Sequence, residues 1–282
     1  MSVTQSAQAV ASVDGGAVRA SSRGDRTEQE RLFARDGFVV IRNLVPKERL
    51  ANLRTKILDE FSHARRSGSM FSAGGNLTGH LNCFPGVDAR FAYDALEEHG
   101  VFDFIRAVYA LPFGGFDVGC NLNLPNSVVQ HYHTDSTFID HFMTVNIAMV
   151  DTDVENGAIE VAPGTHKSFH PYWRFALERR NTGTQVPMSQ GDVLVRTSNL
   201  WHRGMPNRTS TPRPMLAFNF GEKRGQFGDP FQFNEGKLKF YENWFRTNWL
   251  GQLRERTFIA APFTYDTFRF VRSLFTHKGY AE

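Results

Sequence analysis

The spacing of apolar positions changes along the chain and predicts two kinds of structure. Residues 27–37 and 47–61 carry apolar side chains at helical spacing, and Pro46 suits the first turn of the second helix. Between them, the run FVVIR at 38–42 predicts a buried strand. Residues 90–112 again have the pattern of a helix. A helix, a strand and further helices therefore precede the middle of the chain.

From residue 116 to residue 222 the pattern changes to short strands separated by turns. Turn residues such as Asn156 with Gly157, and Pro163 with Gly164, divide this part of the chain. Many short strands with such spacing indicate a β-sandwich or barrel. The predicted strands are residues 117–124, 128–134, 143–151, 158–162, 192–197, 200–204 and 214–221.

Three segments lack these patterns. Residues 1–25 are rich in Ser, Ala and Gly and predict a disordered leader, and residues 66–88 predict a long loop that forms a substrate-side flap. Residues 226–280 are rich in aromatic side chains and predict a pair of helices packed on the barrel, with a substrate lid or a homo-oligomer contact as alternatives. We expect one domain over 26–282, with its barrel core at about 116–222.

Composition and charge exclude several classes of protein. The hydrophobic content of 41% and charged content of 22% are ordinary for a soluble globular protein. A net charge of +3 without a basic block or a reading motif argues against a nucleic-acid partner. No apolar run is long enough for a membrane span or a signal peptide. The chain has only two cysteines, Cys83 and Cys120, and no CxxC pair, which argues against a structural zinc site. A cytoplasmic location is therefore expected.

The segment QHYHTDS at 130–136 carries the candidate chemistry. Alternation along a strand places His133 and Asp135 on one face, where both can bind the same metal ion. His202 lies at the end of another predicted strand and can supply a third ligand. Two histidines and one carboxylate leave three coordination positions open, as non-haem iron(II) oxygenases require. His131 shares the same face, so a His131–His133 pair is an alternative; otherwise His131 lies in the pocket.

Arg213 supplies a candidate cation for a second ligand. A strand that ends in His202, a turn, and a strand that returns from residue 214 would form a hairpin, with Arg213 at the start of its second strand. A guanidinium there can bind a carboxylate through two hydrogen bonds. The distal carboxylate of 2-oxoglutarate needs such a fixed cation while its keto acid chelates iron.

The chain resembles the phytanoyl-CoA dioxygenase family of iron(II)- and 2-oxoglutarate-dependent oxygenases. The matching motifs are ARDGFVVIRNLVP at 34–46, HTD at 133–135, ENGAIEVAPGTHK at 155–167, QGDVLV at 190–195 and LWHRGMPNRTSTPR at 200–213. The resemblance implies a mainly β fold, a double-stranded β-helix (jelly-roll, cupin-like) barrel with flanking N-terminal and C-terminal helices. It also implies that His133, Asp135 and His202 bind Fe(II) and that Arg213 holds 2-oxoglutarate. Tyr132, where the family often has tryptophan, and the aromatic tail depart from the family pattern.

Further polar residues are candidates for the same pocket. Thr144, Asn146 and Gln130 could hydrogen-bond 2-oxoglutarate, and equally could be ordinary hydrogen-bonded residues of the barrel. The candidates for the substrate side are His131, Asn123 and His80.

These features together predict a dioxygenase that uses Fe(II), 2-oxoglutarate and O2 and releases succinate and CO2. Asp135 provides the carboxylate that related halogenases lack, so we expect hydroxylation of a C–H bond of a small metabolite, or another oxidation, instead of halogenation. The alternatives are a cupin-like metal enzyme that does not use 2-oxoglutarate and a non-catalytic binding protein on the same fold. A peripheral membrane protein that uses the aromatic, basic tail is a third alternative.

Overall fold

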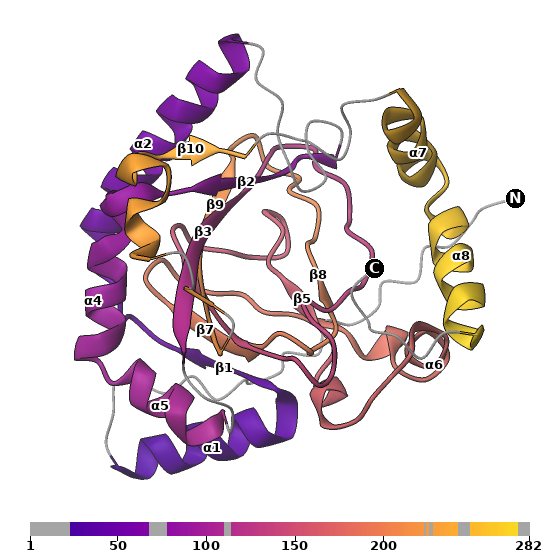
Figure 1. Ribbon diagram of the computed structural model, residues 1–282, viewed down its shortest axis with the longest axis horizontal. Coiled ribbons are helices and arrows are strands. Elements are labelled where there is room, and N and C mark those ends of the chain that lie inside the picture. Colours follow the sequence, from indigo (N-terminus) through magenta and orange to yellow (C-terminus); the bar gives the residue numbers. More distant parts are fainter. Residues whose placement is uncertain are drawn as a thin grey trace, which may run out of the picture.

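The computed structural model describes residues 23–67, 78–109, 114–222, 224–225, 228–241 and 249–275. The predicted leader at 1–25 lies almost entirely outside these residues, so its disorder stays a prediction. Two antiparallel sheets form the centre of the molecule and face each other in Figure 1.

The larger sheet has seven strands and the smaller sheet has three. In spatial order the larger sheet contains β1 (Phe38–Ile41), β7 (Val193–Thr197), β4 (Met143–Ala148), β9 (Arg213–Gly221), β3 (Gly115–Asn123), β2 (His80–Phe84) and β10 (Lys239–Phe240). The smaller sheet contains β6 (Thr184–Gln185), β5 (Glu160–Val161) and β8 (His202–Arg203). The predicted mainly β jelly-roll barrel with flanking helices is confirmed.

Helices cover the outer face of the larger sheet (Figure 1). They are α1 (Arg23–Asp36), α2 (Lys47–Arg66), α4 (Arg90–Glu98) and α5 (Val101–Val108), with the short 3-10 helix η1 (Gly86–Ala89) before α4. In α2 the buried residues Leu50, Leu53 and Ile57 recur every three or four positions, which puts them on one face of the helix. That face packs on the sheet and forms the main hydrophobic core.

Alternation along the strands gives the larger sheet two different faces. Val145 and Ile147 of β4, with Phe218 of β9, are fully buried in the core on the helix side. Thr144 and Asn146 point to the opposite face, toward the smaller sheet. We call this opposite face of the larger sheet the inner face. It carries many polar side chains, among them the predicted site residues Thr144 and Asn146, whereas His133 and His202 lie on the side of the smaller sheet.

The sequence predictions were wrong in four places. The strand that contains His202 and the strand that starts at Arg213 do not form a hairpin, because β8 pairs with β5 in the smaller sheet and β9 lies in the larger sheet. Residues 128–134 do not form a strand; this segment runs beside β8 and is held by separate backbone hydrogen bonds, such as His133 N to His202 O at 2.9 Å. The predicted loop at 66–88 contains the strand β2 and the helix η1. The predicted helix at 90–112 is broken at Gly100, whose φ of 70° ends one helix and begins the next.

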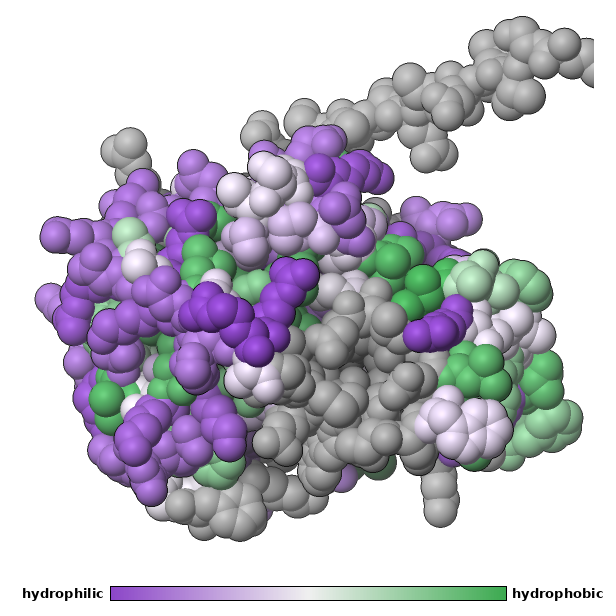
Figure 2. Space-filling model, turned by 90° about the horizontal axis from the view of Figure 1, so that it is seen from above, coloured by the Kyte–Doolittle hydropathy of each residue, from purple (hydrophilic) through white to green (hydrophobic). Residues whose placement is uncertain are grey.

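The C-terminal tail contains the predicted pair of helices, α7 (Trp249–Ala260) and α8 (Pro262–Phe275), which lie on the far side of the barrel beside α6 (Tyr172–Glu178) (Figure 1). The remaining 3-10 helices are η2 (Thr165–Lys167), η3 (Arg180–Thr182) and η4 (Pro230–Gly236). The two tail helices expose large apolar side chains, and Figure 2 shows green surface at its right, where these helices lie. The exposed residues are Trp249, Leu250, Leu253, Phe263, Phe268, Val271, Leu274 and Phe275. A homo-oligomer contact through this tail stays a prediction. Among the described residues, no helix has the length and apolar character needed to cross a membrane.

Replacing Leu216 by alanine should destabilise the protein strongly, because this β9 side chain is fully buried in the core. We expect the free energy of unfolding to fall by about 2–5 kcal/mol. Leu177→Ala is the matched control, since Leu177 is 70% exposed on α6, and its effect should stay within about 0.5 kcal/mol. Urea denaturation of the two variants measures both values, and equal losses would contradict this assignment of the core.

Candidate metal centre

Three side chains meet between the two sheets. His133 and Asp135 come from the segment that runs beside β8, and His202 comes from β8 itself. Asp135 Oδ1 lies 3.7 Å from His133 Nε2 and 3.5 Å from His202 Nε2, and the potential ligand atoms of the three residues all lie within 4.8 Å of one another. Neighbouring ligands of an octahedral ion with bonds of about 2.1 Å stand about 3 Å apart. A small contraction would therefore bring all three onto one ion.

Backbone carbonyls fix the orientation of both imidazoles. His133 Nδ1 lies 2.9 Å from the carbonyl oxygen of His131, and His202 Nδ1 lies 2.9 Å from that of Leu200. Each Nδ1–H donates to its carbonyl, which leaves the Nε2 lone pair free to bind a metal ion. The two Nε2 atoms are also the ones nearest to Asp135.

Arg196 of β7 holds the carboxylate. Its Nη2 lies 2.6 Å from Asp135 Oδ2, and its Nε donates to Asn146 Oδ1 at 3.1 Å. Burial alone would raise the pKa of the Asp135 carboxyl, but Arg196 and the two histidines outweigh it and hold this pKa well below its usual range. Burial lowers the pKa of His133 to about 3. At neutral pH the carboxyl is thus ionised and His133 is neutral, which are the states that metal binding requires.

Arg213 is a buried cation without a charged partner among the described residues. It is 4% exposed at the start of β9, and its Nη2 and Nε donate to the carbonyl oxygens of Gly157 and Asn156 at 3.1 and 3.3 Å. Its Nη1 is buried and makes no hydrogen bond with the described part of the chain. Burial lowers its pKa to about 10, so the guanidinium stays protonated at neutral pH. An unpaired donor on a buried cation suits a carboxylate ligand.

The other residues predicted to bind the co-substrate already have protein partners. Thr144 Oγ1 donates to Asn219 Oδ1 at 3.0 Å, and Asn146 accepts from Arg196. Gln130 Oε1 accepts from the Gly204 backbone N–H at 2.9 Å. These contacts make the three residues part of the frame around the metal centre. A direct contact with the co-substrate stays a prediction for each.

The residues predicted for the substrate side lie in different places. His80 of β2 is 1% exposed, donates from Nε2 to the Val128 carbonyl at 2.8 Å, and has its pKa lowered by burial to about 4. Asn123 donates to the Met205 carbonyl at 2.9 Å, and its Oδ1 is buried without a partner among the described residues. His131 Nδ1 lies 2.9 Å from Asp266 Oδ1 of α8. Their substrate contacts also stay predictions.

The sequence analysis missed a cluster that ties α8 to the metal centre. Asp266 Oδ1 contacts His131 and accepts from the Tyr172 hydroxyl at 2.9 Å, while Oδ2 is paired with Arg180 at 3.0 Å. Burial would raise the pKa of Asp266, but these hydrogen bonds lower it to about 2. The carboxylate is therefore charged over the physiological range and holds His131 in place.

Arg269 completes this cluster one turn further along α8. It is 6% exposed, its Nη1 donates to the Tyr132 carbonyl at 2.5 Å, and its guanidinium lies 4.1 Å from the centre of the Tyr172 ring. Residues 131 and 132, directly before His133, are thus held by a helix from the C-terminal tail. Asp266 and Arg269 are three positions apart and share one helix face, which is the sequence feature that could have indicated them.

The family model described as phytanoyl-CoA dioxygenase (PhyH) matches residues 33–215. The chain belongs to the phytanoyl-CoA dioxygenase family. The matched segment contains His133, Asp135, His202 and Arg213 and ends before α7 and α8. The resemblance noted from the motifs is thereby confirmed, and with it the enzyme class of iron(II)- and 2-oxoglutarate-dependent oxygenases.

Individual relatives are distant. The dioxygenase AndF of Emericella variicolor is 24% identical over 210 residues, which are 67% of this chain and 72% of that protein. The dioxygenase LolE1 of Epichloe uncinata is 30% identical over 103 residues, 34% of this chain and 40% of that protein. Among solved structures, the 2-oxoglutarate-dependent epimerase SnoN has a TM-score of 0.55 at 18% identity and covers 71% of this chain and 84% of its own. AviO1 of Streptomyces viridochromogenes has the same TM-score and identity and covers 72% and 97%. These structures share the fold.

Arg269→Gln should weaken metal binding, because the segment before His133 loses its buried hydrogen-bond donor from α8. We expect the dissociation constant for Fe(II) to rise about 10- to 100-fold, as for other groups that orient a ligand. Chelator competition under anaerobic conditions measures it, and circular dichroism of the metal-free variant reports whether the fold is kept.

Arg256→Gln on the exposed surface of α7 is the control and should bind Fe(II) like the wild type. An Arg269→Gln protein that folds normally and binds Fe(II) with unchanged affinity would contradict a role for α8 in holding the metal-binding segment.

Proposed function

We propose that this protein is a dioxygenase that uses Fe(II), 2-oxoglutarate and O2 to hydroxylate a C–H bond of a small-molecule metabolite, with succinate and CO2 as co-products. The observation that carries the proposal is the combination of a compact His133–Asp135–His202 triad with a buried, unpaired guanidinium at Arg213. A metal site alone would suit many enzymes, whereas this pair of features suits iron together with a dicarboxylate.

In this proposal His133, Asp135 and His202 would hold Fe(II), which would react together with 2-oxoglutarate and oxygen. The side chain of Asp135 is 29% exposed, which is consistent with a centre open on one side. When bound, iron and 2-oxoglutarate supply the oxidising power that removes a hydrogen atom from the substrate. The residues of the chain supply orientation: Arg196 keeps Asp135 charged and in place, and Arg213 receives the distal carboxylate of 2-oxoglutarate.

The type of reaction, hydroxylation, is proposed separately from the class of enzyme. Solved structures with this fold include an epimerase and a carbocyclase, so the fold does not determine the outcome of the reaction. The retained carboxylate of Asp135 favours hydroxylation over halogenation, because halide binding needs the position that this carboxylate would occupy. The dioxygenases AndF and LolE1 are relatives by sequence, which supports a dioxygenase reaction.

We infer a cytoplasmic location and a single domain over residues 26–282. Two buried free thiols, Cys83 and Cys120, support a reducing compartment. Two contacts of the tail support a single domain: β10 pairs with β2 in the larger sheet, and α8 contacts the segment before His133.

Adding Fe(II) and 2-oxoglutarate without oxygen should produce the visible absorption band of the iron–2-oxoglutarate complex. The band should be lost in His202→Ala, because one of the three ligands is missing. It should require about tenfold or more 2-oxoglutarate in Arg213→Lys, because a lysine cannot bind the carboxylate through two hydrogen bonds. Anaerobic titration in a spectrophotometer measures all three proteins.

Leu177→Ala serves as the control and should give the wild-type band. Bound iron without any band in the wild type would refute the use of 2-oxoglutarate and favour the cupin-like enzyme. Failure to bind iron at all would favour a non-catalytic binding protein.

Once a substrate is found, its main product should contain one oxygen atom from oxygen-18 gas and no halogen, even in a buffer with excess chloride or bromide. Mass spectrometry of the product checks both points. A halogenated main product, or an oxidised product without the label, would contradict hydroxylation.

A further inference from the structure

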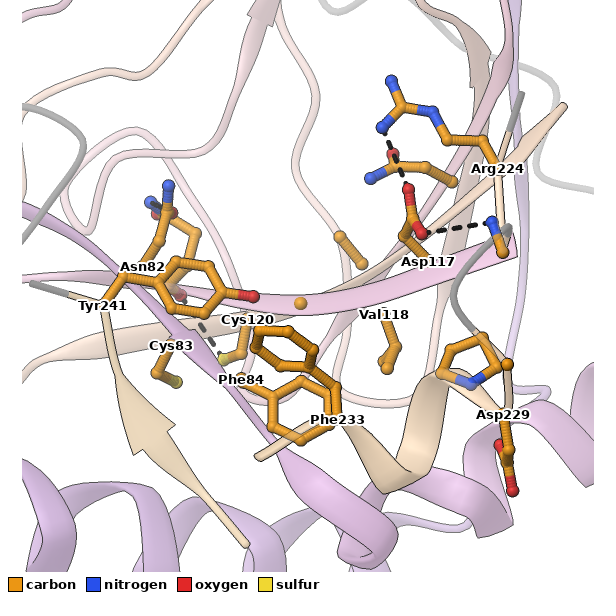
Figure 3. A pocket seen from close by; sticks show the side chains of 17 residues that line it. Asn82, Cys83, Phe84, Asp117, Val118, Cys120, Arg224, Asp229, Phe233 and Tyr241 are labelled. Carbon is orange, nitrogen blue, oxygen red and sulfur yellow. Dashed lines mark hydrogen bonds and ion pairs between the residues drawn. The ribbon is translucent and has the colours of Figure 1, made fainter. Parts of the chain in front are cut away.

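A cavity of about 430 Å³ lies along β3 and is lined by residues of β2, β3 and β9, by residues of the segments 224–225 and 228–233, and by Tyr241. Figure 3 shows it with Asn82 and Tyr241 at one end and Asp117 with Arg224 at the other, and with the Tyr241 hydroxyl directed across it. Its volume lies in the range of small-molecule sites. Its floor includes Gly119, so no side chain covers the strand at that point.

One residue that lines the cavity is connected to the metal centre along a row of the sheet. Asn219 lines the cavity and accepts from Thr144, and Thr144 in turn is paired in register with Arg196, which holds Asp135. Neighbouring strands are about 5 Å apart, so the backbone of Asn219 is about 10 Å from that of Arg196.

A second set of contacts reaches the same centre. The guanidinium of Arg224 lies 3.9 Å from the centre of the Phe142 ring, and the Phe142 backbone N–H donates to Ser198 Oγ at 2.7 Å. The Ser198 carbonyl accepts from the Asp135 N–H at 2.8 Å. These contacts connect Arg224, which lines the cavity, to the backbone of Asp135 through Phe142 and Ser198.

The uncharged polar side chains that line the cavity use only part of their hydrogen-bonding capacity. Asn121 donates to Asn82 Oδ1 and to the Leu81 carbonyl, both at 3.1 Å, and Thr144 donates to Asn219 Oδ1. The amide nitrogens of Asn82 and Asn219, Asn121 Oδ1 and the Tyr241 hydroxyl make no hydrogen bond with the described part of the chain. Together they offer donors and an acceptor to the hydroxyl and carbonyl groups of a ligand.

The charged groups of the cavity neutralise each other. Asp117 is paired with Arg224 at 3.0 Å, and Asp229 is paired with Arg90 at 2.6 Å. Among the described residues that line the cavity, no cation is left for a phosphate. The rings of Phe84 and Phe233 meet edge to face at 5.2 Å and add an apolar wall. Coenzyme A carries several phosphate charges and would find no partner here.

We propose that this cavity is the substrate subsite and takes a neutral, ring-containing, oxygen-rich small molecule, not an acyl-CoA ester. The proposal rests on the proposed function, since it deepens the account of the same centre. In this proposal the ligand is recognised by hydrogen bonds from Asn82, Asn121, Asn219 and Tyr241. Gly119 has no side chain and therefore leaves room for the ligand.

Gly119 allows a direct test. A Cβ atom built on it would meet only the Cys83 carbonyl oxygen, at 3.9 Å, so a larger side chain would extend into the cavity without a clash at its base. Gly119→Leu should therefore fill the cavity, and Gly119→Ala should narrow it slightly. Ala260→Leu adds the same side chain on the exposed surface of α7 and is the matched control.

The experiment titrates three probes into the full chain loaded with Fe(II) and 2-oxoglutarate under nitrogen, with isothermal calorimetry as the readout. The neutral probes are the aryl glucoside salicin and the flavanone naringenin, and the anionic probe is hexanoyl-coenzyme A. We expect at least one neutral probe to bind the wild type and Ala260→Leu, to bind Gly119→Leu about tenfold or more weakly, and to bind Gly119→Ala at an intermediate level. Hexanoyl-coenzyme A should not bind. Thermal unfolding checks that the variants fold, and Gly119→Ala replaces Gly119→Leu if the latter does not.

The proposal is overturned if neither neutral probe binds, if their binding does not depend on residue 119, or if hexanoyl-coenzyme A binds and loses that binding in Gly119→Leu. The absorption band of the iron–2-oxoglutarate complex separates this result from the proposed function. Absence of the band in the wild type would contradict the proposed function. Gly119→Leu should keep the band, because the metal centre is unchanged, and should lose only the binding of the probe. The titrations are repeated without iron and 2-oxoglutarate, so that the cavity is tested in either case.

Discussion

The ion pair between Arg196 and Asp135 joins the two halves of the barrel. Arg196 belongs to β7 of the larger sheet, and Asp135 belongs to the segment that runs beside the smaller sheet. Removing one partner of a buried ion pair typically costs about 3–5 kcal/mol, because the other charge is left without compensation. The low pKa of the Asp135 carboxyl and the orientation of this ligand depend on this contact.

Three buried arginines around the centre have different partners, and the difference indicates what each can do. Arg196 is paired with a carboxylate, so its charge is compensated within the protein. Arg269 donates to a backbone carbonyl and lies over an aromatic ring, which stabilises a cation without an anion. Arg213 has two carbonyl partners and one unused donor. Arg213 thus combines an uncompensated charge with a buried donor that has no partner in the described part of the chain, which suits it to bind a further charged group.

The sequence was most informative where chemistry depends on short spacing. His133 and Asp135 were predicted from strand alternation and His202 from its place at the end of another predicted strand, and the structure brings the three together even though residues 128–134 are not a regular strand. The strand β2 was missed because His80 and Asn82 face the polar interior of the barrel, so the strand looks like a loop in sequence. The contacts of α8 were missed because their partners are 135 and 137 residues away, a separation at which no local pattern operates.

The dependence of the metal centre on α8 also bears on protein synthesis. Both histidines and the aspartate leave the ribosome before α8 does, and a chain elongates at only about 5–20 residues per second. Until α8 emerges, the segment before His133 lacks the carboxylate of Asp266 and the guanidinium of Arg269. The nascent chain thus carries its ligands for several seconds without the contacts that orient them. If α8 sets the affinity for iron, tight iron loading would be a late event that follows the synthesis of α8.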